Sequence, residues 1–219
     1  EPFVEKIISY LDEEYGSFKG APKFPQFYMF DAIFYFYLKT NNQKYLTPVE
    51  TLLSNISSKG VYDQLEGGIA RYSVDEKWII PHFEKMLYDN IQYVNLLTKF
   101  YQKTKKEYFK KKLIQTISFL NKEFKNNENL YGSAYDADSE GVEGKYYVWP
   151  YQELKNLLQD DLSLLEKKYE ISNTGNFEGK NILVESKKEL TEEENNKIIE
   201  IEKKLVQERQ KRVKPFFDS

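Results

Sequence analysis

Residues 27–38 form the most apolar stretch of the chain and constrain its fold more than any other segment. The stretch reads Phe-Tyr-Met-Phe-Asp-Ala-Ile-Phe-Tyr-Phe-Tyr-Leu, and its only charged residue is Asp31. A helix that is apolar almost all round has to be buried on nearly all sides, as in the inner layer of a two-layered helical structure. A continuous buried strand is the alternative, but this stretch is long for a strand.

Much of the remaining chain has apolar residues at helical spacing, separated by long irregular segments such as 61–81 and 126–150. One helix is predicted to begin at Thr47-Pro48 and the last at a capping box of Thr191 and Glu194. The helical patterns cover residues 2–14, 47–59, 83–97, 109–124, 152–158, 162–169 and 192–205. A hairpin is expected around Gly67-Gly68 and a strand over 145–149. This recurrence predicts an all-α fold of stacked helical hairpins, with short β-hairpins in the loops.

The composition excludes several classes of protein. The chain has no cysteine and one histidine, which excludes thiol chemistry and disfavours a zinc site. Its net charge of −3 offers no general attraction for nucleic acid. No run of about 18 apolar residues could span a membrane, and the N-terminus lacks the order of a signal peptide. We expect a cytoplasmic protein without a metal or cofactor.

The segment before and at the start of the 83–97 pattern contains the first candidate functional residues. His82 is the one side chain whose ordinary titration range suits acid and base roles near neutrality. The pattern places it at the start of a helix, where the alternative is that it caps or packs the helix end. Glu84 and Asp89 follow on the same predicted helix; they either point into a cavity or are the acidic residues common in first turns.

A second irregular segment contains two carboxylates at alternate positions, Asp136 and Asp138. In an extended segment such residues point to the same side, which suits an acid/base pair, a cation site or hydroxyl recognition. A calcium-binding loop is excluded, because the position that requires a bidentate glutamate is Tyr147. Aromatic residues also occur in the irregular segments and either stack on sugar faces or form a core beneath the loops: Phe24, Tyr72, Trp78, Tyr135 and Trp149.

Several long motifs together resemble the YyaL, or spermatogenesis-associated protein 20, family of thioredoxin-domain-containing proteins. The match runs in the expected order from about Gly16 to Asp218. The motifs are Gly20-Ala-Pro-Lys-Phe-Pro25, Tyr62-Asp-Gln, Gly67-Gly68, Ala70-Arg-Tyr-Ser-Val-Asp75, Trp78, Pro81-His-Phe-Glu-Lys-Met-Leu-Tyr-Asp-Asn90, Ser133-Ala-Tyr-Asp-Ala-Asp-Ser139, Glu143-Gly-Lys-Tyr-Tyr-Val-Trp149 and Gly175-Asn-Phe-Glu-Gly-Lys-Asn-Ile182.

The resemblance implies a thioredoxin-like domain followed by a toroid of paired helices, similar to six-hairpin glycosidases and N-acylglucosamine 2-epimerases. By that comparison residues 1–219 are a single domain, roughly the first half of an (α/α)6 toroid, without the thioredoxin-like domain and the second half. A half-toroid would expose apolar faces, through which the chain could associate with itself. The expected partners are a sugar-like small molecule and the thioredoxin-like domain of the longer family protein.

The same resemblance implies roles for particular residues in a carbohydrate-binding or carbohydrate-processing domain. His82, Asp136, Asp138 and Glu84 are the catalytic candidates for a sugar isomerase, an epimerase or a glycoside hydrolase. The expected substrate-binding residues are Lys23, Phe24, Arg71, Tyr72, Trp78, Asp89 and Trp149. The alternatives are a non-catalytic scaffold beside the thioredoxin-like domain and an inactive fragment. An enzyme requires His82 and the two aspartates to converge on one cleft, whereas a scaffold does not.

Overall fold

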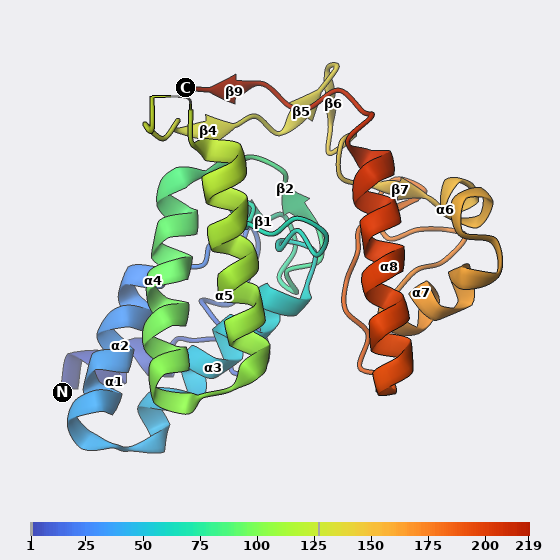
Figure 1. Cartoon of the computed structure of the whole chain (residues 1–219). Helices are drawn as coiled ribbons and strands as arrows, with labels where there is room; N and C mark the ends of the chain where they lie inside the picture. The colour runs from blue at the N-terminus through green and yellow to red at the C-terminus, as the bar shows by residue number, and fades with distance from the viewer. Residues whose placement is uncertain (1, 127) are drawn as a thin grey trace.

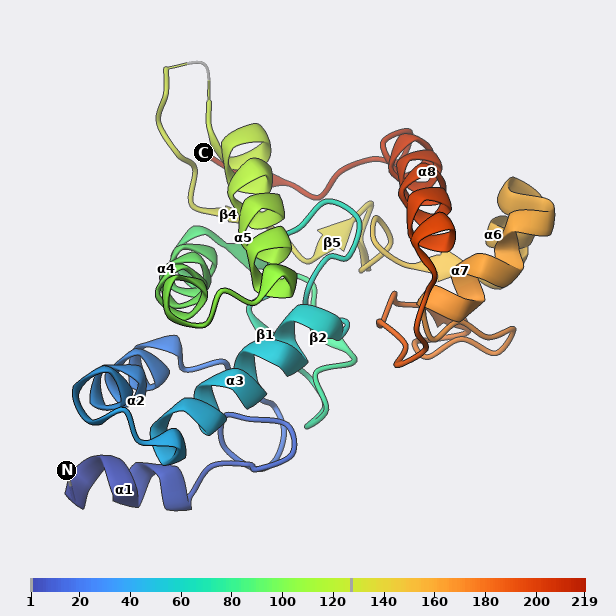
Figure 2. The ribbon, with the colours of Figure 1, turned by 60° about the horizontal axis from the view of Figure 1, so that its bottom comes forward.

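The computed structural model describes residues 2–126 and 128–219 and is mainly helical, with α1–α5 in one group and α6–α8 in another (Figures 1 and 2). Residues 1 and 127, which belong to the predicted domain and to the irregular segment 126–150, lie outside the described residues. The α-helices are α1 (Pro2–Ser9), α2 (Phe27–Thr40), α3 (Gln43–Ser58), α4 (Leu87–Thr104), α5 (Glu107–Phe119), α6 (Tyr151–Leu158), α7 (Leu162–Lys168) and α8 (Glu192–Arg209). A π-helical turn, η1 (Leu120–Phe124), extends α5, and a 3₁₀ turn, η2 (Gln159–Asp161), joins α6 to α7.

Short antiparallel strand pairs connect the helices, as the sequence predicts. The strands are β1 (Tyr72–Ser73), β2 (Pro81–His82), β3 (Lys85–Met86), β4 (Ala134–Tyr135), β5 (Asp138–Ser139), β6 (Val142–Glu143), β7 (Trp149–Pro150), β8 (Lys180–Asn181) and β9 (Phe217–Asp218). They pair as β1–β2, β3–β4–β9, β5–β6 and β7–β8. The chain also turns back at Gly67-Gly68, where Tyr62 pairs with Ile69.

The apolar stretch at 27–38 is helical, as predicted, but it is not buried all round. Phe30, Phe34 and their neighbours face α3 and α4, whereas Tyr28 is 65% exposed and Tyr35 54% exposed. The expectation of burial on nearly all sides is therefore wrong for this chain, because α2 packs on one side only.

One helix start, one helix end and one strand differ from the predictions. The third helix begins at Gln43, where the side chain of Asn42 caps it, and Pro48 lies inside it. The first helix ends at Ser9, because Leu11 leaves the helical path to pair with Phe18. The predicted strand at 145–149 is mostly a turn, and only Trp149 pairs, with Asn181.

The helix predicted from residue 83 begins instead at Leu87, and the chain before it is extended. Pro81, Phe83 and Lys85 are buried while His82 and Glu84 are partly exposed, which is the alternation of a strand. His82 is therefore not at a helix start but in β2, opposite Tyr72. Glu84 and Asp89 likewise do not share a helix, since Glu84 lies between β2 and β3 and Asp89 lies in α4.

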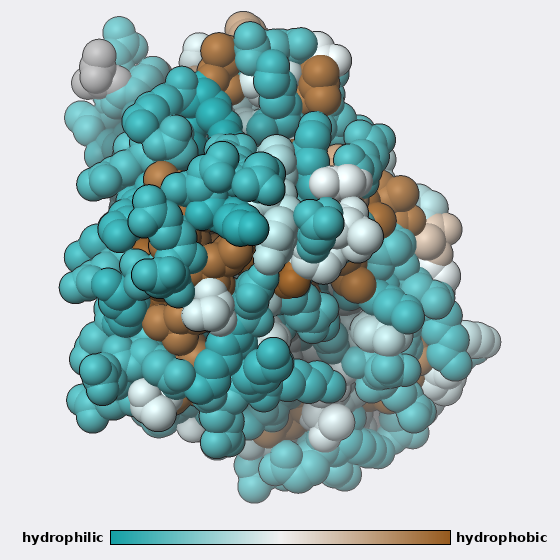
Figure 3. All heavy atoms as spheres, turned by 90° about the vertical axis from the view of Figure 1, so that its right-hand side faces the viewer, coloured by the Kyte–Doolittle hydropathy of each residue, from teal (hydrophilic) through white to brown (hydrophobic). Residues whose placement is uncertain are grey.

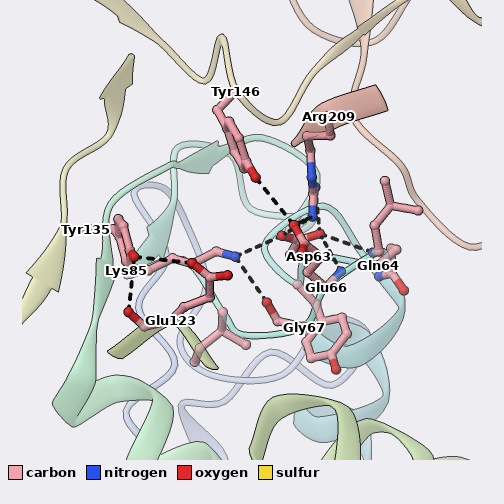
Figure 4. Close-up of polar contacts among 12 residues, drawn as sticks. Asp63, Gln64, Glu66, Gly67, Lys85, Glu123, Tyr135, Tyr146 and Arg209 are labelled. Carbon is pink, nitrogen blue, oxygen red and sulfur yellow. Dashed lines mark hydrogen bonds and ion pairs between the residues drawn. The ribbon is translucent and has the colours of Figure 1, made fainter. Parts of the chain in front are cut away.

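Buried charges join the two groups of helices (Figure 4). Arg209 of α8 makes a two-pronged contact with Asp63, with its two terminal nitrogens 2.9 and 3.0 Å from the carboxylate oxygens. The same arginine contacts Glu66 at 2.9 Å, and Lys85 Nζ lies 3.0 Å from Asp63. Although burial raises the pKa of Asp63, the charges of Arg209 and Lys85 outweigh it and hold this pKa well below its ordinary value.

The capping box of α8 is confirmed and gives the first testable prediction. Thr191 Oγ1 accepts from the backbone N–H of Glu194, whose carboxylate accepts from the N–H of Thr191 at 2.8 Å. We expect Thr191→Ala to lower the free energy of unfolding by about 1 kcal/mol, because the first turn loses an acceptor. Urea unfolding measures this, with the exposed Lys187→Ala as a control that should change little. Equal losses in both variants would contradict the capping role.

Candidate functional site

Three aromatic rings stand side by side on neighbouring extended segments. Lys23 pairs with Ser73, and Tyr72 pairs with His82, so that Phe24, Tyr72 and His82 occupy adjacent positions across these segments. The ring centres of Phe24 and Tyr72 are 4.7 Å apart, and those of Tyr72 and His82 are 4.9 Å apart. These distances between ring centres match the spacing of neighbouring strands, and Tyr72 is stacked between the other two rings. Phe24 is 39% exposed and the side chain of His82 is 29% exposed, so that a ligand can reach the two outer rings of this stack.

Carboxylates lie at both nitrogens of His82. Nδ1 is 2.8 Å from Glu143 Oε1 in β6, and Nε2 is 3.9 Å from Glu84 Oε2. Glu84 accepts in turn from Arg71 at 3.0 Å. In neutral His82 the Nδ1–H can donate to Glu143, which leaves Nε2 as the acceptor beside Glu84 and Arg71. This arrangement can accept a proton from a hydroxyl group or a C–H group of a ligand.

The two aspartates of the second irregular segment lie in different surroundings. Asp138 is exposed in β5, directly opposite Glu143 of β6, so that their side chains share one face of the hairpin. Asp138 is thereby placed next to the carboxylate that holds His82. Asp136 is exposed too, but its Oδ1 accepts from the N–H of Ala137 at 2.6 Å, and its own N–H donates to Phe216.

Asp89 is a buried carboxyl beside the same cluster. It lies in the first turn of α4 and is 9% exposed. Burial raises its pKa to about 7, against the opposing charge of Arg71, while the negative charge of Glu84 adds to the rise. Its Oδ2 has no hydrogen-bond partner among the described residues. A carboxyl of this kind is partly protonated near neutral pH and can donate its proton.

Three of the expected substrate-binding residues are structural. Trp78 is fully buried and donates from its indole nitrogen to the carbonyl of Tyr15 at 2.8 Å. Trp149 is also fully buried, with the guanidinium carbon of Arg212 4.0 Å from a ring centre. Lys23 is 1% exposed and is paired with Asp12 at 2.6 Å. These side chains offer no open face to a ligand in this structure.

Sequence reasoning missed Glu143, the group closest to His82. Its position in the motif Glu143-Gly-Lys-Tyr-Tyr-Val-Trp149 was a signal, but its partner lies 61 residues earlier in the chain. Within residues 2–126 and 128–219, no group of three or more histidine, aspartate or glutamate side chains is arranged to hold a metal ion. In the same part of the chain, no helix is both long and apolar enough to cross a bilayer.

Comparison with known proteins identifies relatives of the chain. It is 31% identical to the mouse protein named spermatogenesis-associated protein 20, over 76% of this chain and 24% of the mouse protein. It is 29% identical to the human protein of that name, over 95% of this chain and 31% of the human protein. An uncharacterized protein of Caenorhabditis elegans is 31% identical over 69% of this chain. No protein-family model matches the chain. The chain thus spans about a quarter to a third of the mouse and human relatives.

Proposed function

The chain belongs to the spermatogenesis-associated protein 20 family, and from this premise we propose that it is a carbohydrate-binding or carbohydrate-processing domain. In this proposal a sugar-like ligand lies against the outer faces of Phe24 and His82. His82 exchanges a proton with it through Nε2, while Arg71 and Glu84 hydrogen bond its hydroxyl groups. The single observation that supports the proposal most is the contact of 2.8 Å between His82 Nδ1 and Glu143.

Each group has a chemical reason to take part. Glu143 orients the imidazole and selects the nitrogen that faces the ligand, as carboxylates do for catalytic and metal-binding histidines. Arg71 has a side chain that is 42% exposed and uses one nitrogen for Glu84, which leaves donors for an oxygen of the ligand. Phe24 is 39% exposed, so that an aromatic face is open for stacking on the apolar face of a sugar.

The wider architecture of this proposal is the first half of an (α/α)6 toroid beside a thioredoxin-like domain. It is supported by the two helical hairpins, α2 with α3 and α4 with α5, whose first helices pack on each other. Apolar side chains left exposed on α2 and α4 are where the remaining hairpins would pack: Tyr28, Tyr35, Leu38, Tyr88 and Ile91. Seen from the side of α6–α8, the surface is mostly hydrophilic, with hydrophobic side chains in small patches (Figure 3).

The proposal can be tested on one NMR signal, because His82 is the only histidine. The imidazole resonances of the untagged chain are recorded while neutral sugars, uronic acids and sugar phosphates are added. We expect one of these classes of ligand to shift the imidazole resonances saturably. Glu143→Gln should weaken the binding of that ligand about tenfold, since a charge-assisted hydrogen bond that orients the ring is lost.

Asp160→Asn, an exposed change in η2, is the control and should leave the affinity unchanged. Resonances that no sugar moves at millimolar concentration would contradict the proposal and favour the non-catalytic scaffold. A shift that is identical in wild type and Glu143→Gln would show that the ligand binds without the His82–Glu143 pair.

A further inference from the structure

A pocket of about 400 Å³ lies away from His82, where α5 faces α8. Helix α5 contributes Tyr108 and Lys112 to its wall, α8 contributes Glu202, and the chain between α7 and α8 contributes Tyr169 and Glu185. In Figure 1 the two helices run roughly parallel, with loop segments of the chain visible between them. The volume is within the range of pockets that bind small molecules.

Glu185 is the fixed anion of this pocket. Its carboxylate contacts Lys112 Nζ at 3.0 Å and Lys168 Nζ at 3.3 Å, and it accepts from the hydroxyl of Tyr108 at 2.9 Å. Burial raises the pKa of Glu185, but the charges of the two lysines lower it by more, so that the pKa lies below its ordinary value. Glu185 thus cancels one of the two lysine charges beside it.

Glu202 is in the opposite situation. It is partly buried and accepts from the hydroxyl of Tyr169 at 2.5 Å. Burial and the negative charge of Glu185 raise its pKa above the ordinary value, against the opposing effects of Tyr169, Lys168 and Lys112. These four groups, from α5, from the end of α7 and from the chain before α8, have the largest effects on this pKa.

The pocket therefore has an excess of positive charge. Lys112 and Lys168 face the single fixed anion Glu185, and Lys111 adds a third cation at the exposed rim. When Glu202 carries a proton, its carboxyl group is a further donor. Such a set favours an anion over a neutral molecule of the same size.

We propose that the pocket between α5 and α8 binds a small organic acid, whose carboxylate lies among the lysines and accepts a hydrogen bond from the carboxyl group of Glu202. A carboxylate that meets this group draws a proton onto Glu202, so that binding takes up a proton from the buffer. The site is independent of the His82 cluster, and it gives the domain a second ligand, which is an anion.

Titration calorimetry with succinate as the probe tests this site, with butane-1,4-diol as a neutral molecule of the same length. At pH 7 and constant ionic strength we expect heat from succinate and none from the diol. In two buffers with different ionisation enthalpies, the heat of succinate binding should differ for the wild type, because a proton is taken up. Glu202→Gln should still bind but with equal heats in both buffers, since the amide donates without titrating.

Two further variants separate the site from general effects. Lys168→Gln should weaken succinate binding about tenfold. Lys111→Gln, at the rim of the pocket, should also weaken it but leaves the contacts of Glu185 intact. This second variant keeps the test valid if Lys168→Gln unfolds. Glu208→Gln, on the same helix outside the pocket, should change neither affinity nor proton uptake. Equal heats from succinate and the diol, no heat from succinate, or proton uptake that persists in Glu202→Gln would overturn the proposal.

Discussion

Asp63→Asn is expected to lower the free energy of unfolding by about 3–5 kcal/mol, because it removes the carboxylate that Lys85 and Arg209 share. The side chains of Lys85 and Arg209 are only 4% and 2% exposed, so that water cannot replace the lost partner. Asparagine has nearly the same shape, so the loss reflects charge and not packing. Glu66 remains as one partner of Arg209 but does not contact Lys85 in the described network.

Urea unfolding at pH 7 measures this loss, with the exposed Asp160→Asn as the matched control. The pH dependence gives a second check. Because the pKa of Asp63 is depressed in the folded state, its stabilising effect is present above its ordinary pKa near 4 and is lost as the pH falls further. The free energies of unfolding of the wild type and Asp63→Asn should therefore approach each other in acid. A loss below about 1 kcal/mol at pH 7 would show that the buried network is dispensable.

Asp89→Asn, in contrast to Asp63→Asn, is expected to raise the free energy of unfolding at neutral and alkaline pH. Burial raises the pKa of Asp89 to about 7, whereas an unfolded aspartate titrates near 3.8. Between these values the folded chain holds a proton that the unfolded chain has lost, so that stability falls as the pH rises from about 4 to 7. The full effect is on the order of 4 kcal/mol. Asparagine removes this dependence because its amide does not titrate.

Melting temperatures of wild type and Asp89→Asn across pH 4–8 make this comparison. At pH 4 we expect the melting temperature of the variant to equal that of the wild type or to lie slightly below it, since its amide has an unpaired group in place of Oδ2. It should melt several degrees higher at pH 8. Parallel pH profiles of the two proteins would contradict a raised pKa at Asp89.

The helical hairpins could be predicted from the sequence because their apolar stripes have a clear period. The predictions are wrong where a buried residue is charged or where the burial pattern depends on distant parts of the chain. Between residues 81 and 86 every second residue is buried, as in a strand, but one of these buried residues is Lys85. Because a lysine is not apolar, the sequence does not show the period of a strand, and the spacing of Phe83 and Met86 resembles that of a helix instead. His82 was consequently expected at the wrong kind of element.

The candidate site could be predicted in part. His82, Glu84, Arg71 and Phe24 were singled out from loop composition and family motifs, and the structure brings them together around Tyr72. The tryptophans were expected to bind ligand and are core residues, because a large ring in a loop carries no signal of its burial. Glu143 is brought to His82 by the β5–β6 hairpin, and a contact of this separation leaves no periodic trace in the sequence.

The contact between Arg209 and Asp63 joins residues 146 positions apart, and this has a consequence for folding on the ribosome. The α2–α3 and α4–α5 hairpins make most of their contacts within themselves and with each other, and they can form once residue 119 has left the exit tunnel. The loop that holds Asp63 and Lys85 cannot complete its buried charge cluster until α8 has been translated. We therefore expect a nascent chain with finished helical hairpins and an open loop to persist until Arg209 has left the exit tunnel, and this intermediate is the form that chaperones and proteases would meet.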